Sequence, residues 1–252
     1  MSLDKIIDSC SYLLNNYPGA SEVRDYLNAR LLPETQKEYK FGYFPSVDNI
    51  SLLENLVSEK LLLELKLLYS RNIEDSWGPR QIKTSYFNNY PLIMPYTNVY
   101  GDTIGIVGRV ICNEDERQKL SIPKYKNTVF KKSMHLFGLD KAKEFIMKED
   151  CVYIVEGQFD CIKSYEKGFK NVVALGSASL TDYQVSLLNR YTNNIFLLLD
   201  NDEAGNKSRI KIINKYSDLT NIRDLYLPKQ YKDIDEFFNH NNYNDLSFSI
   251  KI

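Results

Sequence analysis

The spacing of apolar residues changes along this 252-residue chain and separates it into regions. Over roughly the first 60 residues, leucine and isoleucine recur at steps of three and four, which is typical of helices that bury one side. From residue 86 to 111 the chain has β-branched and aromatic runs, interrupted by proline and by Tyr100-Gly101-Asp102. This pattern predicts strands joined by a tight turn. The first part of the chain is therefore expected to be a mixed α+β subdomain.

Four short apolar runs follow, at residues 151–156, 171–176, 194–200 and 222–228. Segments with a helical pattern separate them, so the chain reads as four consecutive strand-helix repeats. Strands that are apolar along nearly their whole length are typical of a parallel sheet covered on both faces. We predict an α/β fold, a parallel sheet flanked by helices, with the α+β subdomain before it. The expected parts are 1–148, 149–240 and a C-terminal tail, 241–252.

Composition narrows the class of protein. With 43% hydrophobic and 26% charged residues the chain has the makeup of a globular protein. It contains no apolar run close to the roughly 20 residues of a membrane span, and it begins without a basic and then apolar signal segment, so we expect a cytoplasmic location and no membrane partner. The four cysteines are scattered without a CxxC pair, which predicts no zinc site in this chain. The many Asn, Lys, Ile and Tyr residues suggest an AT-rich coding sequence, which fits a phage, a mobile element or an AT-rich bacterium. If a phage encodes the chain, the expected location is the host cytoplasm.

Charge is unevenly distributed although the net charge is only −1. Residues 117–148 hold nine Lys or Arg against two acidic residues, whereas the chain after residue 148 holds twelve against fifteen. A basic strip with interleaved aromatic residues, beside an acidic region, suits a site that holds a polyphosphate or nucleic-acid backbone next to divalent metal. Solvated helix faces also collect lysine, so both interpretations stay open on charge alone.

Acidic residues follow the ends of the expected strands. Because the carboxyl ends of parallel strands meet at one edge of a sheet, Glu156 and Asp200 should face a common crevice. Carboxylates gathered there would repel one another unless a hard divalent cation, Mg²⁺ or Mn²⁺, bound between them. Each acid also has a structural interpretation, since acids favour the first turn of a helix and aspartate caps helices. The candidate metal ligands are Glu156, Asp160, Asp200, Asp202, Asp233 and Asp235.

These motifs, taken in order, resemble a known family. EGQFD, ALGSASLT, LLLDNDEAGNKS and KDIDEFF resemble the Toprim domain of the bacterial DnaG-type primases. Upstream, YLNARLLPETQKEYKFGYFP, PLIMPYTNVYGDTIGIVGRVI and IPKYKNTVFKKSMHLFGL resemble the preceding part of the primase catalytic core. The resemblance spans roughly residues 20–240. It is more specific than a lone EGxxD, which topoisomerases, recombination mediators and Toprim nucleases share.

The resemblance implies a DNA primase core, a DNA-directed RNA polymerase and nucleotidyltransferase of DNA replication. It would use Mg²⁺ or Mn²⁺ to make short RNA primers from NTPs on a single-stranded DNA template. The resemblance makes Glu156 the catalytic glutamate and Asp200 with Asp202 the metal-binding pair, also counted as catalytic. It implies contacts with template or nucleotide for four basic residues, Arg30, Arg109, Lys124 and Lys132.

The chain departs from the family pattern in its extent. DnaG-type primases usually carry a zinc-binding domain before this core and a helicase-docking domain after it, and this chain has room for neither. The expected partners are therefore a replicative helicase and a separate zinc-domain protein. Two alternatives remain open: a Toprim-type nuclease, because the same acidic site can cleave phosphodiesters, and a non-catalytic nucleic-acid-binding accessory protein of another primase.

Overall fold

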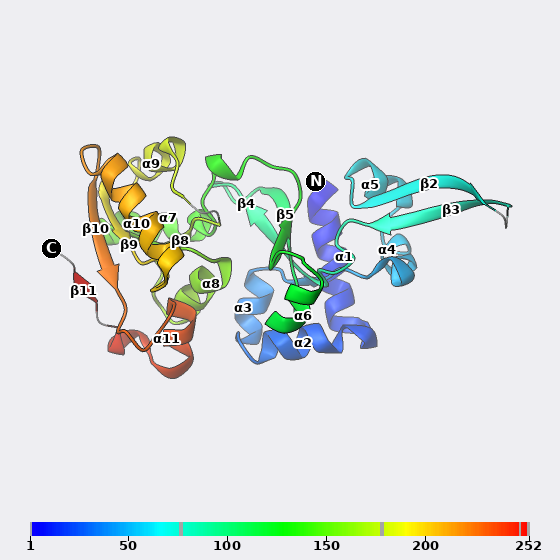
Figure 1. Ribbon diagram of the computed structural model, residues 1–252, viewed down its shortest axis with the longest axis horizontal. Coiled ribbons are helices and arrows are strands. Elements are labelled where there is room, and N and C mark those ends of the chain that lie inside the picture. Colours follow the sequence, from blue (N-terminus) through cyan, green and yellow to red (C-terminus); the bar gives the residue numbers. More distant parts are fainter. Residues whose placement is uncertain (1, 76–77, 177–178, 247, 251–252) are drawn as a thin grey trace. The chain divides into compact units, whose positions relative to one another are not determined.

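The computed structural model describes residues 2–75, 78–176, 179–246 and 248–250. It has two compact units (Figure 1): unit 1 consists of Met1–Tyr96 with Thr103–Phe130, and unit 2 of Thr97–Asp102 with Lys131–Ile252. Residues 131–148 thus belong to unit 2, so the boundary between the compact units falls earlier in the chain than the boundary expected at 148/149. The expected domain limits stay a prediction.

Unit 1 is built on a four-stranded sheet in the order β1-β4-β5-β6. Helix α1 packs against β1 and β5, and its buried side chains recur at steps of three and four, as the apolar pattern predicted. The expected strands around a tight turn are β4 and β5, joined at Gly101, whose φ of +89° suits glycine. The elements of this part are α1 (Ser2–Asn16), α2 (Ser21–Asn28), α3 (Pro33–Glu38), β1 (Gly42–Tyr43), α4 (Ser51–Glu54), α5 (Glu59–Glu64), β4 (Leu92–Thr97), β5 (Thr103–Arg109), α6 (Glu114–Lys119) and β6 (Tyr125–Asn127), with short 3-10 turns at Pro18–Ala20 and Val47–Asn49.

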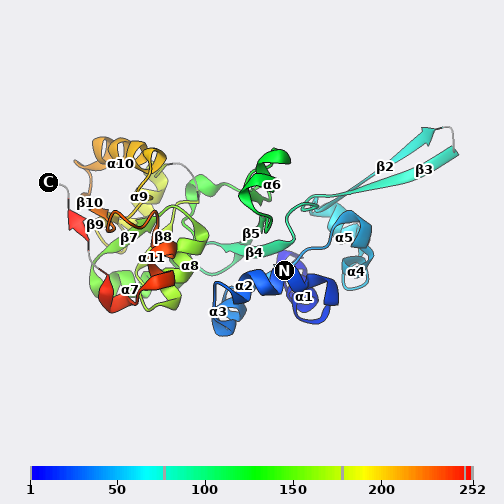
Figure 2. The same ribbon diagram turned by 60° about the horizontal axis from the view of Figure 1, so that its bottom comes forward.

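A long hairpin in unit 1 has no counterpart in the sequence analysis. Strands β2 (Leu68–Asp75) and β3 (Gly78–Ser85) pair antiparallel along their whole length and form a separate two-stranded sheet (Figure 2). Most described side chains of the hairpin are exposed or half-buried. A ribbon without a buried face lacks the apolar alternation that reveals a strand in sequence.

Unit 2 contains the expected parallel sheet. Its strand order is β11-β10-β9-β7-β8, and β10, β9, β7 and β8 run parallel while β11 pairs antiparallel with β10. The four predicted strand-helix repeats are confirmed. The elements are α7 (Leu139–Glu149), β7 (Val152–Val155), α8 (Gln158–Glu166), β8 (Val172–Ala174), α9 (Asp182–Leu188), β9 (Asn194–Leu197), α10 (Glu203–Tyr216), β10 (Asn221–Tyr226), α11 (Ile234–His240) and β11 (Ser249–Ile250), with 3-10 turns at Lys132–Met134 and Tyr243–Asp245.

Helices cover both faces of this sheet. Helices α9 and α10 lie on one face and α8 and α11 on the other, where α11 packs against α8 (Figure 2). A continuous apolar cluster joins β7, β8 and β9 to α7, α9 and α10. On the opposite face Tyr153 contacts Phe169 and Phe196, and Phe248 from the expected C-terminal tail stacks on it. Both faces of the strands are therefore packed, which leaves their carboxyl ends as the place where polar side chains gather.

No helix in the described part of the chain combines the length and the apolar character that a membrane crossing requires.

Candidate active site

The ends of β7 and β9 bring the first two acidic residues together. The two strands are neighbours in the sheet and run parallel, so Glu156, directly after β7, and Asp200, three residues after β9, lie at the same edge. The backbone N–H of Asp200 donates a hydrogen bond to Oε1 of Glu156 over 3.3 Å. Both side chains are half-buried. The two residues expected to face a common crevice are thus direct neighbours at this edge.

Three other acids bind the backbone at the starts of helices. Asp160 Oδ2 accepts from Gly157 N at 2.9 Å before α8, and Asp202 Oδ1 accepts from Gly205 N at 2.9 Å at the start of α10. Asp233 Oδ1 accepts from the amide of Glu236 at 2.8 Å at the start of α11. Carboxylates are stabilised there by free amides and by the helix dipole. The capping interpretation is therefore correct for Asp202 and Asp233, and it is compatible with a site because one carboxylate offers several lone pairs.

A compact group of oxygen ligands forms where α8 and α11 pack together. Asp160, Asp233 and Asp235 each offer a carboxylate oxygen, and these atoms lie within 4.8 Å of one another. Asp235 is only 8% exposed. Several carboxylate oxygens at this separation fit a hard cation such as Mg²⁺ or Mn²⁺, which prefers oxygen ligands.

The charges at this edge act on one another. Burial raises the pKa of Asp200 to about 7, with further increases from Glu156 and Asp233. Burial also raises the pKa of Asp160 well above its ordinary value, and Asp233, Asp200 and Asp235 add to the rise. Burial likewise raises the pKa of Glu156, and repulsion from Asp202 raises it further, whereas the Asp200 amide and Arg209 lower it. The six predicted acids therefore behave as one electrostatic group that a bound cation would stabilise.

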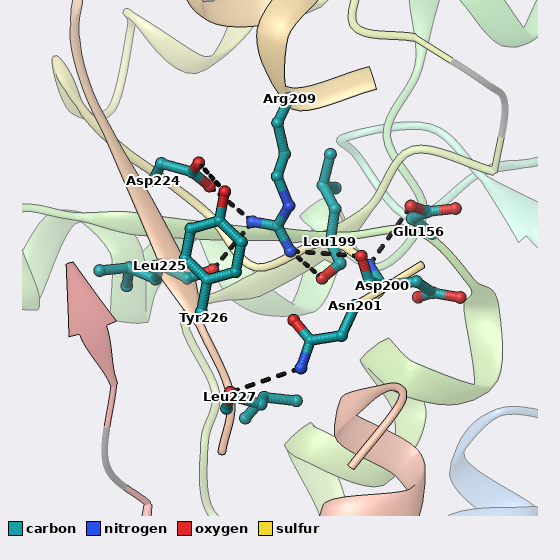
Figure 3. Close-up of polar contacts among 9 residues, drawn as sticks. All are labelled: Glu156, Leu199, Asp200, Asn201, Arg209, Asp224, Leu225, Tyr226 and Leu227. Carbon is teal, nitrogen blue, oxygen red and sulfur yellow. Dashed lines mark hydrogen bonds and ion pairs between the residues drawn. The ribbon is translucent and has the colours of Figure 1, made fainter. Parts of the chain in front are cut away.

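Two residues that the sequence analysis missed hold the loop between β9 and α10 (Figure 3). Arg209 of α10 donates to the carbonyl oxygens of Leu199 and Asp200, and Asn201 donates to the carbonyl oxygens of Leu227 and Tyr231 over 3.4 and 2.9 Å. Arg209 lies four residues after Gly205 and three before Ile212, on the buried side of α10. That helical spacing is the signal by which it could have been found.

Gly205 permits the close approach of α10 to the same loop. A Cβ atom at this position would lie 2.2 Å from the carbonyl oxygen of Asp200 and 3.0 Å from Oε1 of Glu156. Side chains larger than hydrogen would therefore displace the Asp200 peptide. The glycine of the DNDEAG motif is required by contact with the backbone of the first aspartate.

Three of the four predicted basic residues form a cluster with tyrosines in unit 1. The guanidinium carbon of Arg109 lies 5.4 Å from the ring centre of Tyr26 and 4.9 Å from that of Tyr125, its cross-strand partner. Arg30 approaches Tyr26 within 5.4 Å, and Lys124 Nζ lies 5.9 Å from the ring centre of Tyr125. Cations and aromatic faces of this kind can bind phosphates and stack on bases. Of the aromatic residues interleaved in the basic strip 117–148, Tyr125 makes such contacts, with Arg109 and Lys124.

The fourth basic residue, Lys132, belongs to unit 2. Its Nζ donates to the carbonyl oxygen of Gly176 over 3.0 Å, and burial lowers its pKa. Gly176 belongs to the ALGSASLT motif, of which residues 177–178 lie outside the described part of the chain. Lys132 thus contacts the ALGSASLT motif of unit 2. The roles of all ten predicted site residues stay predictions.

Comparison with known protein families agrees with these two parts. Residues 153–238 match the profile of a family described as Toprim-like, and residues 11–143 match the profile of the DNA primase catalytic core, N-terminal domain. The second part is therefore a Toprim-like domain: a parallel sheet with acids beyond the carboxyl ends of its strands, in the order EG, DxD and DxD. It follows a primase-type N-terminal domain.

Individual relatives are DNA primases. The chain is 30% identical over 239 residues to the DNA primase of Aquifex aeolicus, covering 94% of this chain and 45% of the relative. It is 32% identical over 246 residues to that of Synechococcus elongatus, covering 90% and 33%. The chain thus spans less than half the length of these relatives.

Solved primase structures have the same fold. The Aquifex aeolicus primase structure, which comprises zinc binding and RNA polymerase domains, matches with a TM-score of 0.74 and 32% identity over 94% of this chain and 56% of that one. The E. coli primase catalytic core matches with a TM-score of 0.75 and 25% identity over 96% and 76%. The chain belongs to the family of DnaG-type DNA primase catalytic cores.

The raised pKa values predict how pH affects the stability of the metal-free protein. Asp200 has a pKa of about 7 in the folded chain against an ordinary value of 3.8, so the folded state binds its proton more tightly than the unfolded state does. This group therefore lowers the free energy of unfolding progressively as the pH rises through the interval between these two values. In EDTA, Asp200→Asn should show a smaller loss of stability than the wild type between about pH 4 and pH 7.

Urea denaturation at several pH values measures this difference. Asp218→Asn, at an exposed position of the same unit, is the matched control and should follow the wild type. If the free energy of unfolding changed with pH equally in Asp200→Asn and the wild type, ionisation of Asp200 would not destabilise the folded state.

Gly205→Ala should destabilise the chain although alanine favours helices. The added methyl group would collide with the Asp200 carbonyl group, and overpacking of this kind costs about 1–3 kcal/mol. Asn206→Ala is the control. This residue follows Gly205 on α10 and is exposed, so the substitution places no methyl group against the Asp200 carbonyl group. Denaturation by urea compares the two, and a Gly205→Ala protein as stable as the wild type would contradict the close approach.

Proposed function

We propose that this chain is the catalytic core of a DNA primase, which synthesises short RNA primers on single-stranded DNA by metal-dependent nucleotidyl transfer. The observation that carries the proposal is the gathering of six carboxylates at one edge of the Toprim-like sheet, in a chain that belongs to the primase core family. A merely structural role would not require six acids at one edge of a sheet, where burial and acidic neighbours raise the pKa values of Glu156, Asp160 and Asp200.

We assign the metal to these carboxylates. Asp160, Asp233 and Asp235 supply closely spaced oxygen atoms, and Glu156, Asp200 and Asp202 supply the adjoining charge. Mg²⁺ or Mn²⁺ bound there would activate the attacking hydroxyl group and neutralise the leaving pyrophosphate. The raised pKa values support this assignment, because carboxylates that resist ionisation without a cation gain most from its arrival.

The reaction joins the 3′-hydroxyl oxygen of one nucleotide to the α-phosphorus of the next and releases pyrophosphate. The hydroxyl group loses its proton during this attack. Glu156 lies beside the Asp200 amide with a raised pKa, which suits it to accept a proton or to act as a ligand. Asp200 and Asp202 are assigned to the metal site, where a bound cation would help to orient the triphosphate.

The basic residues are proposed to hold the nucleic acid and the nucleotide. Arg30, Arg109 and Lys124 surround two tyrosine rings, which offers phosphate contacts beside stacking surfaces. Lys132, next to the carbonyl group of Gly176 in the acidic unit, is assigned to the triphosphate. Its lowered pKa reflects partial burial, which strengthens its interaction with an anion.

The proposed partners follow from the reaction. A replicative helicase would expose the single-stranded template, and a separate zinc-domain protein would select the initiation site. The first of these roles is required by the substrate, and the second is suggested by the zinc binding domain named for the Aquifex aeolicus structure. If a phage encodes the chain, it would work in the host cytoplasm, where template and NTPs are present.

Asp200→Ala should abolish primer synthesis while leaving the fold intact, because it removes a metal ligand and also a source of repulsion. The assay incubates the protein with labelled single-stranded DNA, NTPs and Mg²⁺ and looks for RNA. Asp218→Ala is the control and should retain full activity. Undiminished synthesis by Asp200→Ala would contradict the assigned site, and a shortened DNA strand without RNA would favour the nuclease alternative.

Lys124→Ala should weaken binding to single-stranded DNA and reduce its salt dependence. Loss of one phosphate contact should lower the slope of log K against log salt concentration by about 0.7. Fluorescence anisotropy at several salt concentrations measures the slope. Lys60→Ala, an exposed lysine of the same unit that pairs with Glu64, should leave the slope unchanged. A Lys124→Ala slope equal to that of the wild type would remove Lys124 from the binding surface.

A further inference from the structure

Arg209 is a buried cation directly behind the acidic site. Its side chain is 1% exposed, and it extends from α10 toward the ends of β9 and β10 (Figure 3). On the β10 side, Nη1 binds Asp224 Oδ1 at 2.5 Å and the carbonyl oxygen of Leu225 at 2.8 Å. On the β9 side, Nη2 binds the carbonyl oxygens of Leu199 and Asp200, the latter at 3.4 Å. One guanidinium group thus joins the two strand ends.

The guanidinium group is itself held in a defined orientation. Tyr226 places its ring 4.3 Å from the Arg209 guanidinium carbon, and its hydroxyl group donates to Asp224 Oδ2 over 2.7 Å. The planar fork of arginine can bind carbonyl oxygens on both strands at once, which a lysine ammonium group cannot reproduce. Arg209, Asp224 and Tyr226 together form what we call the arginine clamp.

The clamp acts on the peptide that carries the candidate metal ligand Asp200. Strand β9 ends at Leu197, and the two carbonyl groups that Arg209 Nη2 binds belong to Leu199 and Asp200, beyond that end. Binding the Asp200 carbonyl group fixes the plane from which the side chain departs. On the other side of the same residue, the Asp200 N–H points to Glu156 Oε1. The direction of the Asp200 carboxylate therefore depends on the contact between Arg209 and the Asp200 carbonyl group, which lies on the side away from the acidic cluster.

We propose that Arg209 is a positioning residue for the metal site, which holds the Leu199-Asp200 backbone so that the Asp200 carboxylate meets the other acids. This inference rests on the proposed metal-dependent function of the site. Groups that orient metal ligands from behind contribute to metal affinity, and their mutation typically lowers it about 10- to 100-fold.

The charge of Arg209 also acts on the cluster before a cation binds. The pKa of Glu156, which burial raises most, is lowered by Arg209 and by Lys232. Lys232 is exposed and lies 3.7 Å from Asp202, so solvent screens its charge. Arg209 is buried, and its charge reaches the acids with less screening. The clamp as a whole is neutral, because Asp224 carries the opposite charge, so its main effect on the site is to orient the backbone.

A plain ion pair that fastens α10 to β10 would have similar contacts, so the test must separate the two roles. Removing Arg209 alone would leave Asp224 as a buried charge without its partner and could unfold the chain. The double variant Arg209→Met/Asp224→Asn removes both charges together and keeps a hydrogen-bond acceptor for Tyr226. Arg209→Lys keeps the charge but not the fork. Lys211→Met, exposed on the same helix, is the control.

Two measurements on the full chain decide the question. Electron paramagnetic resonance of free Mn²⁺ gives the affinity for the metal alone, and hydrogen-deuterium exchange gives the protection of amides 198–202. We expect the double variant and Arg209→Lys to bind Mn²⁺ about 10- to 100-fold more weakly than the wild type and to exchange faster in this segment. Lys211→Met should match the wild type in both.

Wild-type Mn²⁺ affinity in both a cooperatively folded double variant and Arg209→Lys would overturn the positioning role, and the metal site would stand. If the wild type itself bound no Mn²⁺, the proposed function would fail instead. Unchanged hydrogen-deuterium exchange at amides 198–202 in the variants would separately contradict the claim that Arg209 holds this segment. If the double variant does not fold, Arg209→Lys decides by the same two readouts.

Discussion

Repulsion among six carboxylates at the edge of one sheet is the constraint that organises unit 2. Left to themselves in water these groups would move apart and ionise at ordinary pH. The sheet prevents this, because Glu156 and Asp200 follow neighbouring parallel strands and the Asp200 backbone N–H donates to the Glu156 carboxylate. Burial then raises the pKa of Asp200 to about 7. The fold therefore maintains an arrangement that is unfavourable without a cation and favourable with one.

The backbone around the site compensates for part of this cost. Three helices begin at this edge, and Asp160, Asp202 and Asp233 each accept a backbone N–H there. The loop that carries Asp200 is bound by Arg209 from α10 and by Asn201 to the loop after β10. The same interactions that stabilise the helix starts and the loop also direct the acids toward one another. Stability and function are thus served by shared contacts.

Much of unit 2 was predictable because β7, β8 and β9 are packed on both faces and so appear as nearly continuous apolar runs. Their carboxyl ends then located the acids without any structure. The β2–β3 hairpin escaped prediction because a largely exposed ribbon leaves no apolar alternation. Arg209 was not predicted as a site residue because arginine is usually exposed and the sequence does not distinguish a buried arginine from an exposed one. Only its helical spacing placed it on the buried side of α10. Lys132 is near Lys124 in sequence, yet it belongs to the other compact unit.

The central claim is that the carboxylate cluster is a divalent metal site. The most direct measurement is a crystal structure of the wild-type chain soaked in Mn²⁺, with anomalous scattering recorded at a wavelength where manganese contributes strongly. The account predicts an anomalous peak bound by oxygens of the cluster, among Asp160, Asp233 and Asp235 or between Glu156 and Asp200. Saturating Mn²⁺ with no peak at these carboxylates would contradict it.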